Sequence, residues 1–401
     1  MLGMLSSVHT AELLTLVLAV LTTLVHGQQF KGDVIPNSLP DIAGAEKAYW
    51  KVNDAASGNY STLITHSSLN SQNERHDPAD VKRLIIAVHG LGRDGWLYVT
   101  SVLNSLNQLD GTGPNIDNVV VLAPHFANGD DKGTSYPWDD TQPAGGYGSN
   151  STAMVWAGSE WISGSASQYP VNGFKTSSYD ILDRIIRWYS LKTRFPNLKT
   201  IVIAGHSAGA QLTQRYAAIG HDLTSALDGT RLIYSISNPN SFLWLNSSRP
   251  LDTSSCTDYN DWRQGIDNFD VPYNTALLAQ GSAAVTENYK RKGIAYGRAL
   301  RDLGGIDEGC GATVQGSNRH ERFLNFIATF TPACPDPTSD DCDTIDYVNT
   351  THNEAAMWAA DSGKARLFLD FFDGAGSRSP DFWCSRISAS DDPYPNPNCD
   401  S

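Results

Sequence analysis

Residues 200–211 read TIVIAGHSAGAQ, and this stretch decides the fold. Its first half, TIVIA, is the apolar, β-branched run typical of a buried strand. The pattern Gly-x-Ser-x-Gly follows at once in residues 205–209 (GHSAG). Beyond it, apolar residues recur at helical spacing at Leu212, Tyr216 and Ile219. The sequence therefore predicts a strand, a tight turn and a helix in direct succession.

The turn in this unit would carry Ser207. Gly-x-Ser-x-Gly arises easily by chance in a chain with 34 glycines among 401 residues, so the flanking strand and helix carry the inference. In such a unit the serine side chain projects from the turn, and glycines on either side avoid clashes with the backbone. The N-terminus of the helix also points toward a developing oxyanion. Ser207 is the candidate nucleophile; the alternative is a serine in an ordinary glycine-rich turn.

Further strands and helices alternate on both sides of this unit. Short apolar runs predict strands at residues 83–89, 118–124, 231–236, 292–296 and 345–348. Helices are expected from a cap at Ser178, over residues 318–330, and over 354–372 with a break near Gly363. This alternation predicts an α/β fold with a mostly parallel central sheet and helices on both faces.

The core is expected to span residues 81–375, after an N-terminal segment with the first strands at 28–80 and before a Pro-rich tail at 376–401. Two long connections, 127–177 and 238–290, interrupt the alternation and are expected to be functional. The first leaves the edge of the sheet where the serine lies, so we expect it to form a cap. Tryptophans in these connections could line an apolar pocket or pack their own loops: Trp156, Trp161, Trp244 and Trp262.

Residues 1–27 are predicted to be a signal peptide. Their apolar run, 13–25, is shorter than the roughly 20 residues of a membrane span. No Lys or Arg precedes this run, which leaves an uncleaved anchor as the alternative. We expect a secreted protein with no stable membrane anchor.

Cysteines and glycosylation sequons agree with export to an oxidising compartment. The six cysteines could form three disulfides, and sequence proximity suggests Cys334–Cys342 and Cys384–Cys399 as two of them. Four Asn-x-Ser/Thr sequons occur, at Asn59, Asn150, Asn246 and Asn349.

The formal net charge of −14 argues against a nucleic-acid partner, because an acidic body repels polyphosphates. The cysteines lack paired Cys-x-x-Cys spacing and the acidic runs lack EF-hand spacing, so no metal is expected. No glycine-rich phosphate loop follows an early strand, and no cofactor is expected.

From Arg83 to Phe372 the chain resembles the α/β-hydrolase superfamily. More narrowly, it looks like secreted fungal proteins of this fold, through the segments VHGLGRDGW, GHSAGAQ, NPNSFLWL and QGSNRHERF. The resemblance implies an α/β-hydrolase fold and a serine hydrolase. It also implies an oxyanion hole made by the backbone N–H of Ala208 and by the loop after residues 83–89, where Leu91 is the first choice and Gly92 the second. In that loop His89 is expected to be structural, and Arg93 and Asp94 to pair locally.

The superfamily orders its triad as serine, acid and histidine. A serine hydroxyl needs a base that titrates near neutral pH, and two histidines follow Ser207 at suitable places, His352 and His320. His352 comes after a predicted strand and before the last helix, where the superfamily places its base, so it is preferred. The acid should follow residues 292–296. Asp302 is the first choice and Asp307 the second.

These residues predict hydrolysis of a small-molecule or lipid-like carboxylic ester through an acyl-enzyme. An amidase or peptidase would use the same residues, because the triad does not distinguish the leaving groups. A third reading is a non-catalytic binding protein on a hydrolase scaffold.

Overall fold

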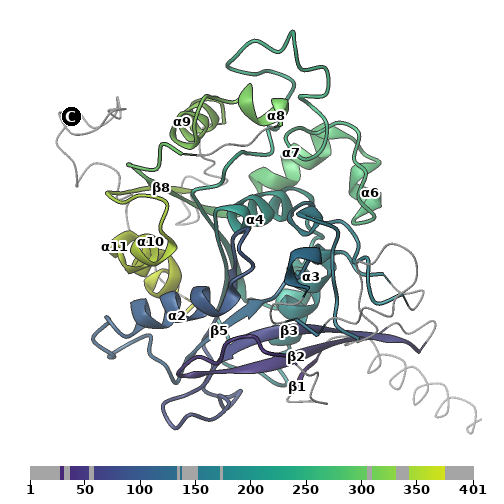
Figure 1. Cartoon of the computed structure of the whole chain (residues 1–401). Coiled ribbons are helices and arrows are strands. Elements are labelled where there is room, and N and C mark those ends of the chain that lie inside the picture. The colour runs from purple at the N-terminus through teal and green to yellow at the C-terminus, as the bar shows by residue number, and fades with distance from the viewer. Residues whose placement is uncertain are drawn as a thin grey trace, which may run out of the picture.

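In the described part of the chain, nine strands form one twisted sheet that runs through the molecule (Figure 1). The strands are β1 (Gln28–Phe30), β2 (Ala45–Asn53), β3 (Tyr60–Ser68), β4 (Arg83–Val88), β5 (Val119–Pro124), β6 (Thr200–His206), β7 (Arg231–Ser237), β8 (Gly293–Ala299) and β9 (Thr344–Val348). The computed structural model describes residues 28–30, 37–53, 58–132, 136–137, 152–171, 175–304, 309–330 and 343–374. The predicted signal peptide and the Pro-rich tail lie outside the described residues.

The strand order is β1-β2-β3-β5-β4-β6-β7-β8-β9. Strands β1, β2, β3 and β5 pair antiparallel in turn. From β5 onward the pairing is parallel, in the order β5, β4, β6, β7, β8 and β9. In the sheet, β5 lies between β3 and β4, so β4 and β5 are exchanged relative to their order in the sequence. The next four strands, β6 to β9, are parallel and in sequence order, and this is the arrangement of the α/β-hydrolase fold. The predicted fold is confirmed.

Alternating side chains of the central strands enter two separate cores. In β4, Leu84 and Ile86 contact the core on the side of α3 (Ser178–Tyr189) and α4 (Ala208–Ile219). Ile85 and Ala87 contact the other core, against α2 (Gly95–Leu106) and α10 (Glu354–Ala359). Because both faces are covered, the parallel strands appear in the sequence as continuous apolar runs rather than as alternating patterns.

The helices cover the two faces and one end of the sheet (Figure 1). The remaining ones are η1 (Gly129–Asp131), η2 (Glu160–Ser163), α5 (Thr224–Leu227), α6 (Thr275–Leu278), α7 (Ser282–Lys290), α8 (Cys310–Thr313), α9 (Arg319–Thr329), α11 (Asp361–Lys364) and η3 (Ala365–Leu369). Two boundaries differ slightly from the predictions. The cap of α3 is Ser177, whose hydroxyl accepts from the Tyr179 amide, and the last helical region breaks at Ala360 rather than at Gly363.

The tryptophans of the two long connections belong to the core on the α3 and α4 side. Their side chains are buried there, and this supports the reading in which they pack their loops: Trp156, Trp161, Trp244 and Trp262. Residues 133–135, 138–151 and 172–174 of the first connection lie outside the described residues, so the cap stays a prediction.

The second connection is tied to α8 by a disulfide between Cys256 and Cys310. The four cysteines of the two predicted pairs, Cys334–Cys342 and Cys384–Cys399, lie outside the described residues. Asp258 lies beside the disulfide and completes the one group of three metal-ligand side chains found among the described residues. Disulfide sulfurs are not thiolates, so these cysteines do not supply metal ligands.

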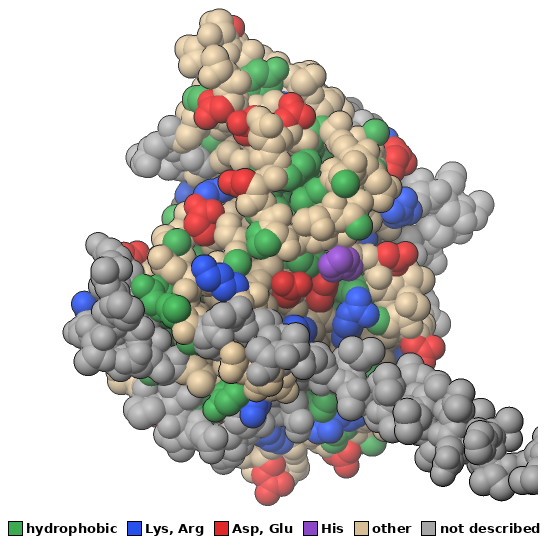
Figure 2. All heavy atoms as spheres, turned by 90° about the vertical axis from the view of Figure 1, so that its right-hand side faces the viewer, with side chains coloured by type: hydrophobic (Ala, Val, Ile, Leu, Met, Phe, Trp, Pro, Cys, Tyr) green, Lys and Arg blue, Asp and Glu red, His purple; other side chains and the backbone are tan. Residues whose placement is uncertain are grey.

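Lys and Arg side chains lie among Asp and Glu side chains on the face shown in Figure 2. Within the described part of the chain, no helix combines the length and apolar character of a membrane span.

Candidate active site

Ser207 sits in the tight turn between β6 and α4. Its backbone has φ 59° and ψ −122°, in the region that L-residues rarely adopt, and its amide donates to the Ser237 carbonyl at 3.0 Å. This conformation carries the side chain away from the sheet at the carboxyl end of β6. Helix α4 begins at Ala208, directly after Ser207, so its N-terminus lies at the same end; the Ala210 and Gln211 amides donate to the Ser207 carbonyl.

Both glycines of the turn are required by close backbone contacts. A Cβ on Gly205 would lie 2.2 Å from the Gly209 carbonyl oxygen, and one on Gly209 would lie 2.1 Å from the Val88 carbonyl oxygen. Any side chain at either position would therefore force the helix away from β4 and β6. The Gly-x-Ser-x-Gly pattern here reflects packing as well as turn geometry.

The loop after β4 lies beside the serine. A Cβ on Gly90 would be 3.9 Å from the Ser207 Oγ and 2.8 Å from the Tyr98 hydroxyl. Leu91, the first choice for the oxyanion hole, follows Gly90 directly and is 58% exposed. Gly92, the second choice for the oxyanion hole, is next in the same loop, against the Asp94 carboxylate.

Arg93 holds this loop in place. It has φ 54°, its amide donates to the Gly90 carbonyl at 3.1 Å, and its guanidinium donates to the Leu91 carbonyl at 2.6 Å. The same guanidinium binds Asp131 at 2.9 Å. Among the described residues its ion-pair partners are Asp131 and Asp130, so the expected ion pair with Asp94 is wrong. The charge of Arg93 still acts on Asp94, where it lowers the pKa against the larger, raising effect of burial. The left-handed backbone at Arg93 explains why its side chain leaves Asp94 and reaches η1.

His89 has the structural role expected of it. The Phe126 amide donates to its Nε2 at 3.0 Å, so the ring proton is on Nδ1, which donates to the Gly90 carbonyl at 2.9 Å. Burial lowers the pKa of His89 to about 4, and the ring stays neutral at ordinary pH. His89 therefore fixes the start of the loop and is unsuited to be a base.

His352 and Asp302 come together from the ends of two neighbouring strands. His352 follows β9 and Asp302 follows β8, and the distance from Nδ1 to Oδ2 is 2.6 Å. The Asp302 side chain is 2% exposed and that of His352 is 30% exposed. The histidine ring therefore borders solvent while its acidic partner is buried beneath it.

Asp302 is also bound by two arginines. Arg319 Nη1 donates to Oδ1 at 3.1 Å, and Arg298 Nη1 lies 3.6 Å from Oδ2. Burial alone would raise the pKa of this carboxyl. The hydrogen bond and charge of His352 and the charges of the two arginines outweigh burial and lower the pKa below its ordinary value. Asp302 is therefore ionised at all ordinary pH values.

The alternative base, His320, occupies a different environment. It is buried in the first turn of α9, and its Nδ1 accepts from Arg298 Nε at 3.0 Å. A buried ring that binds an arginine in this way supports a structural role for His320. Asp307, the alternative acid, lies outside the described residues.

His206, the residue before the serine, connects the turn to His352. The centroids of the two rings are 4.5 Å apart, at an interplanar angle of 41°. The Asn238 side-chain nitrogen lies 3.1 Å from His206 Nε2, and the Asn238 side-chain oxygen accepts from the Ala299 amide. Burial lowers the pKa of His206 well below its usual value, so this ring is neutral. The base candidate therefore rests against the turn that carries Ser207.

Sequence reasoning missed Arg319, Asn238 and Asp131, which support the site without forming it. A partial signal existed, since Arg319 and Asn238 lie within two segments that carry the family resemblance, QGSNRHERF and NPNSFLWL. The structure joins these segments to GHSAGAQ through hydrogen bonds. Gln211 donates to Ser241, and Phe242 and Gln315 bond each other.

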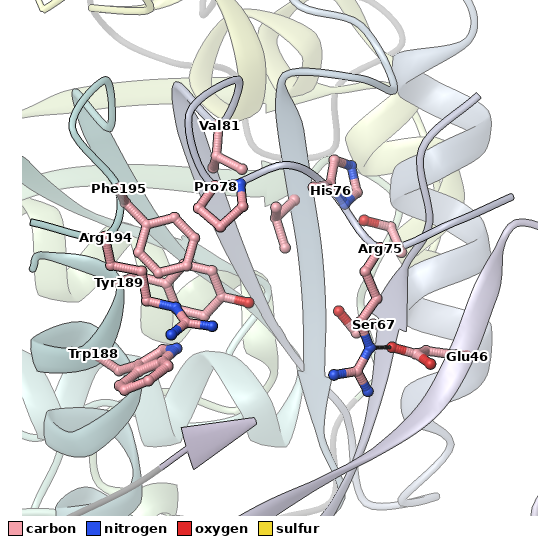
Figure 3. Close-up of a pocket in the computed structure, with 12 residues that line it drawn as sticks. Glu46, Ser67, Arg75, His76, Pro78, Val81, Trp188, Tyr189, Arg194 and Phe195 are labelled. Atoms are coloured by element: carbon pink, nitrogen blue, oxygen red, sulfur yellow. Dashed lines mark hydrogen bonds and ion pairs between the residues drawn. The ribbon is translucent and has the colours of Figure 1, made fainter. Parts of the chain in front are cut away.

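A cavity of about 80 Å³ lies elsewhere, lined by residues that include Val81, before β4, and Val120, near the start of β5 (Figure 3). It is therefore at the amino end of the parallel strands, opposite Ser207. Its polar groups have partners within the fold, since Arg75 binds Glu46 at 2.5 Å and His76 Nε2 donates to the Ile116 carbonyl at 2.8 Å. This cavity is separate from the site around Ser207.

No family model and no curated protein sequence matches the chain. Similar solved structures include a poly(3-hydroxybutyrate) depolymerase from Bordetella parapertussis, with 14% identity, a TM-score of 0.49 and coverage of 80% of this chain and 89% of that chain. A siderophore hydrolase from Aspergillus nidulans has 13% identity, a TM-score of 0.40 and coverage of 83% and 96%. An S-formylglutathione hydrolase from Agrobacterium tumefaciens has 12% identity, a TM-score of 0.43 and coverage of 84% and 99%. At these identities and TM-scores the likeness says nothing about activity.

Proposed function

We propose that this α/β-hydrolase-fold chain is a serine hydrolase that cleaves carboxylic esters through an acyl-enzyme. Ser207 is the nucleophile, His352 the base and Asp302 the acid; Leu91 and Ala208 supply the N–H groups of the oxyanion hole. The observation that carries the proposal is the His352–Asp302 pair at 2.6 Å, placed against the strained turn of Ser207 by the neighbouring ring of His206.

The first half of the reaction forms the acyl-enzyme. Ser207 Oγ attacks the ester carbonyl carbon while His352 Nε2 takes the hydroxyl proton. The carbonyl oxygen becomes an oxyanion, which the N–H groups of Leu91 and Ala208 stabilise. His352 then gives its proton to the alkoxide, the C–O bond breaks and the alcohol leaves. In the second half, water attacks the acyl carbon while His352 takes its proton; the bond to Ser207 Oγ then breaks, His352 returns the proton to that oxygen, and the carboxylic acid leaves.

Asp302 determines which ring nitrogen of His352 accepts the proton. Its carboxylate accepts from Nδ1 of His352, so the other ring nitrogen, Nε2, is left as the acceptor. Because the pKa of Asp302 is lowered, the carboxylate keeps its charge when His352 becomes an imidazolium. His206, the ring beside His352, stays neutral and does not compete for the proton.

Apolar side chains next to the site favour a small-molecule or lipid-like ester as substrate. Leu91 is 58% exposed beside Gly90, and Leu303 is 44% exposed beside Asp302. Solvent-exposed leucines in the two loops that carry the proposed site residues offer apolar contact to an acyl or alcohol group. Hydrolysis of p-nitrophenyl esters of graded chain length, with Ser207→Ala as control, tests the proposal. Turnover of matched anilides instead of esters would favour the amidase alternative, and turnover of neither would favour a non-catalytic protein.

Secretion is part of the proposal. The disulfide between Cys256 and Cys310 suits an oxidising compartment, and three of the four sequon asparagines, Asn59, Asn246 and Asn349, are exposed. Asn150 lies outside the described residues. Mass spectrometry of the exported protein would show whether the chain begins near Gln28 and carries glycans.

A further inference from the structure

We propose that Arg319 is a positioning residue of this site, which holds the Asp302 carboxylate in place and whose charge extends the activity of His352 as a base to lower pH. This inference rests on the proposed function, because it assigns Arg319 a role in that same site.

Arg319 is placed for this role by the start of α9. Its amide donates to the Gly304 carbonyl at 3.2 Å, which docks the first turn of the helix beside the loop that follows Asp302. Its Nη1 then reaches Asp302 Oδ1 at 3.1 Å. His352 binds the other oxygen, Oδ2. With each oxygen bound to a different residue, the carboxylate is held against rotation about its Cβ–Cγ bond.

The second arginine, Arg298, binds the backbone of Asp302 and has a different role. It is fully buried on β8; its Nη2 donates to the backbone carbonyl of Asp302 and its Nε to His320. Arg298 therefore anchors the backbone of the acid, and its removal would leave buried groups without partners. The Arg319 side chain is 17% exposed, so its charge can be altered without opening the core.

The charge of Arg319 should act on His352 through Asp302. A bare carboxylate beside an imidazole stabilises the imidazolium, whereas a cation on the far side of that carboxylate offsets the effect. Removing this cation should therefore allow the ring to become protonated, and unable to accept the serine proton, at a higher pH than in the wild type.

Each element around this pair carries its own charged or titratable groups. His206 on β6 is neutral, because burial lowers its pKa well below the usual value. Arg298 comes from β8 and the buried His320 from α9. Glu354 comes from α10, where it accepts from Ser101 at 3.3 Å. Arg319 is the partly exposed cation of this set that binds the carboxylate directly.

The test compares charge-removing and charge-keeping variants of Arg319 in the full-length, disulfide-bonded protein. Arg319→Gln and Arg319→Met both remove the charge, and methionine keeps an unbranched aliphatic side chain. Arg319→Lys keeps the charge but lacks the planar guanidinium group. Arg301→Gln is the matched control, since Arg301 is exposed, lies next to Asp302 in sequence, and its guanidinium donates to the Asn349 carbonyl at 3.2 Å rather than to the Asp302 carboxylate. Two readouts are needed: the NMR titration midpoint of His352, and the acidic limb of the kcat/KM profile.

We expect loss of the charge to raise both readouts by about half a pH unit to one unit, the size of an ion interaction across several ångströms near a protein surface. Arg319→Lys should keep the wild-type midpoint, with kcat lower by about tenfold because the carboxylate is held less firmly. Arg301→Gln should match the wild type.

An unchanged His352 midpoint in a folded Arg319→Gln or Arg319→Met variant would overturn the inference. Failure of the proposed function is separate, because it would show as absent ester turnover in the wild type. The NMR titration needs no turnover, so it tests the charge coupling even then.

Discussion

His206 and His352 lie with their ring centroids 4.5 Å apart, although one precedes the serine turn and the other follows the last strand of the sheet. The order of the strands explains this contact. Strands β6, β7, β8 and β9 are adjacent and parallel, so the loops that leave their carboxyl ends meet at one edge. Asp302 and Asn238 leave the same edge and complete the surroundings of the two rings.

The paired geometry of His352 and Asp302 predicts a graded loss of activity. His352→Ala should lower kcat by a factor on the order of 10⁵, because nucleophile and base act as one unit. Asp302→Asn should cost less, on the order of 10³ to 10⁴, since the ring keeps its place but loses the carboxylate that fixes its tautomer. Steady-state kinetics with circular dichroism as a check on folding would measure both.

The buried His320 serves as the matched control for this series. Its replacement by alanine should change kcat by less than about tenfold, while lowering stability by about 1–3 kcal/mol because Arg298 loses a buried acceptor. A collapse of kcat in a folded His320→Ala variant, beside near-normal activity in His352→Ala, would overturn the assignment of the base.

Gly209 should tolerate no side chain. Gly209→Ala would place a Cβ 2.1 Å from the Val88 carbonyl oxygen and 2.7 Å from that of His89. Backbone atoms cannot move aside cheaply, so we expect a loss of at least about 1–3 kcal/mol in the free energy of unfolding, together with loss of activity. Urea unfolding measures the first. Gly113→Ala is the control, because nothing lies within 4 Å of the added methyl group; equal stability of the two variants would contradict the packing described for the turn.

Stability should fall on mild acidification. Burial lowers the pKa values of His66 and His89 from 6.5 to about 4, and those of His125 and His206 are also depressed. Between about pH 6.5 and 4 the unfolded chain binds protons that the folded one does not. Each such histidine then costs about 1.4 kcal/mol per pH unit. The pKa of Asp302 is lowered in the folded state, so this residue decreases the free energy of unfolding only when the pH falls below the ordinary pKa of a carboxyl group.

Urea unfolding at a series of pH values between 7 and 5 would measure this dependence. His66→Gln should make it shallower, because one buried titrating group is removed. The comparison with His66→Gln is decisive, because buried carboxyls such as Asp183, whose pKa burial raises, act in the opposite sense in both proteins. An unchanged pH dependence in folded His66→Gln would contradict the neutral state of that buried ring.

The disulfide should stabilise the second long connection. Cys256 and Cys310 are 54 residues apart in sequence, so the bond closes a long loop. Replacing both cysteines by serine should lower the free energy of unfolding by about 2–4 kcal/mol. Thermal unfolding of the oxidised protein and of the double variant would show the difference. Two free thiols at these positions in the purified protein would contradict the pairing.

The sheet could be predicted from the sequence because strands buried on both faces leave continuous apolar runs, as in residues 83–88 and 200–204. The serine turn was likewise encoded locally, in the two glycines that backbone contacts require. The roles of Arg319 and Asn238 were not, because each binds a group from a distant loop whose position only the folded sheet decides. The wrong pairing of Arg93 with Asp94 has the same origin, since the reversed backbone at Arg93 turns its side chain toward η1.

The central claim is that Ser207 is a nucleophile activated by its surroundings. A fluorophosphonate probe reacts with such a serine and leaves a covalent adduct, which peptide mapping can locate. We expect one adduct, on the peptide that contains Ser207, in the wild-type protein, and none in a folded Ser207→Ala variant. Undiminished labelling of that variant, or no labelling of the folded wild type, would contradict the account.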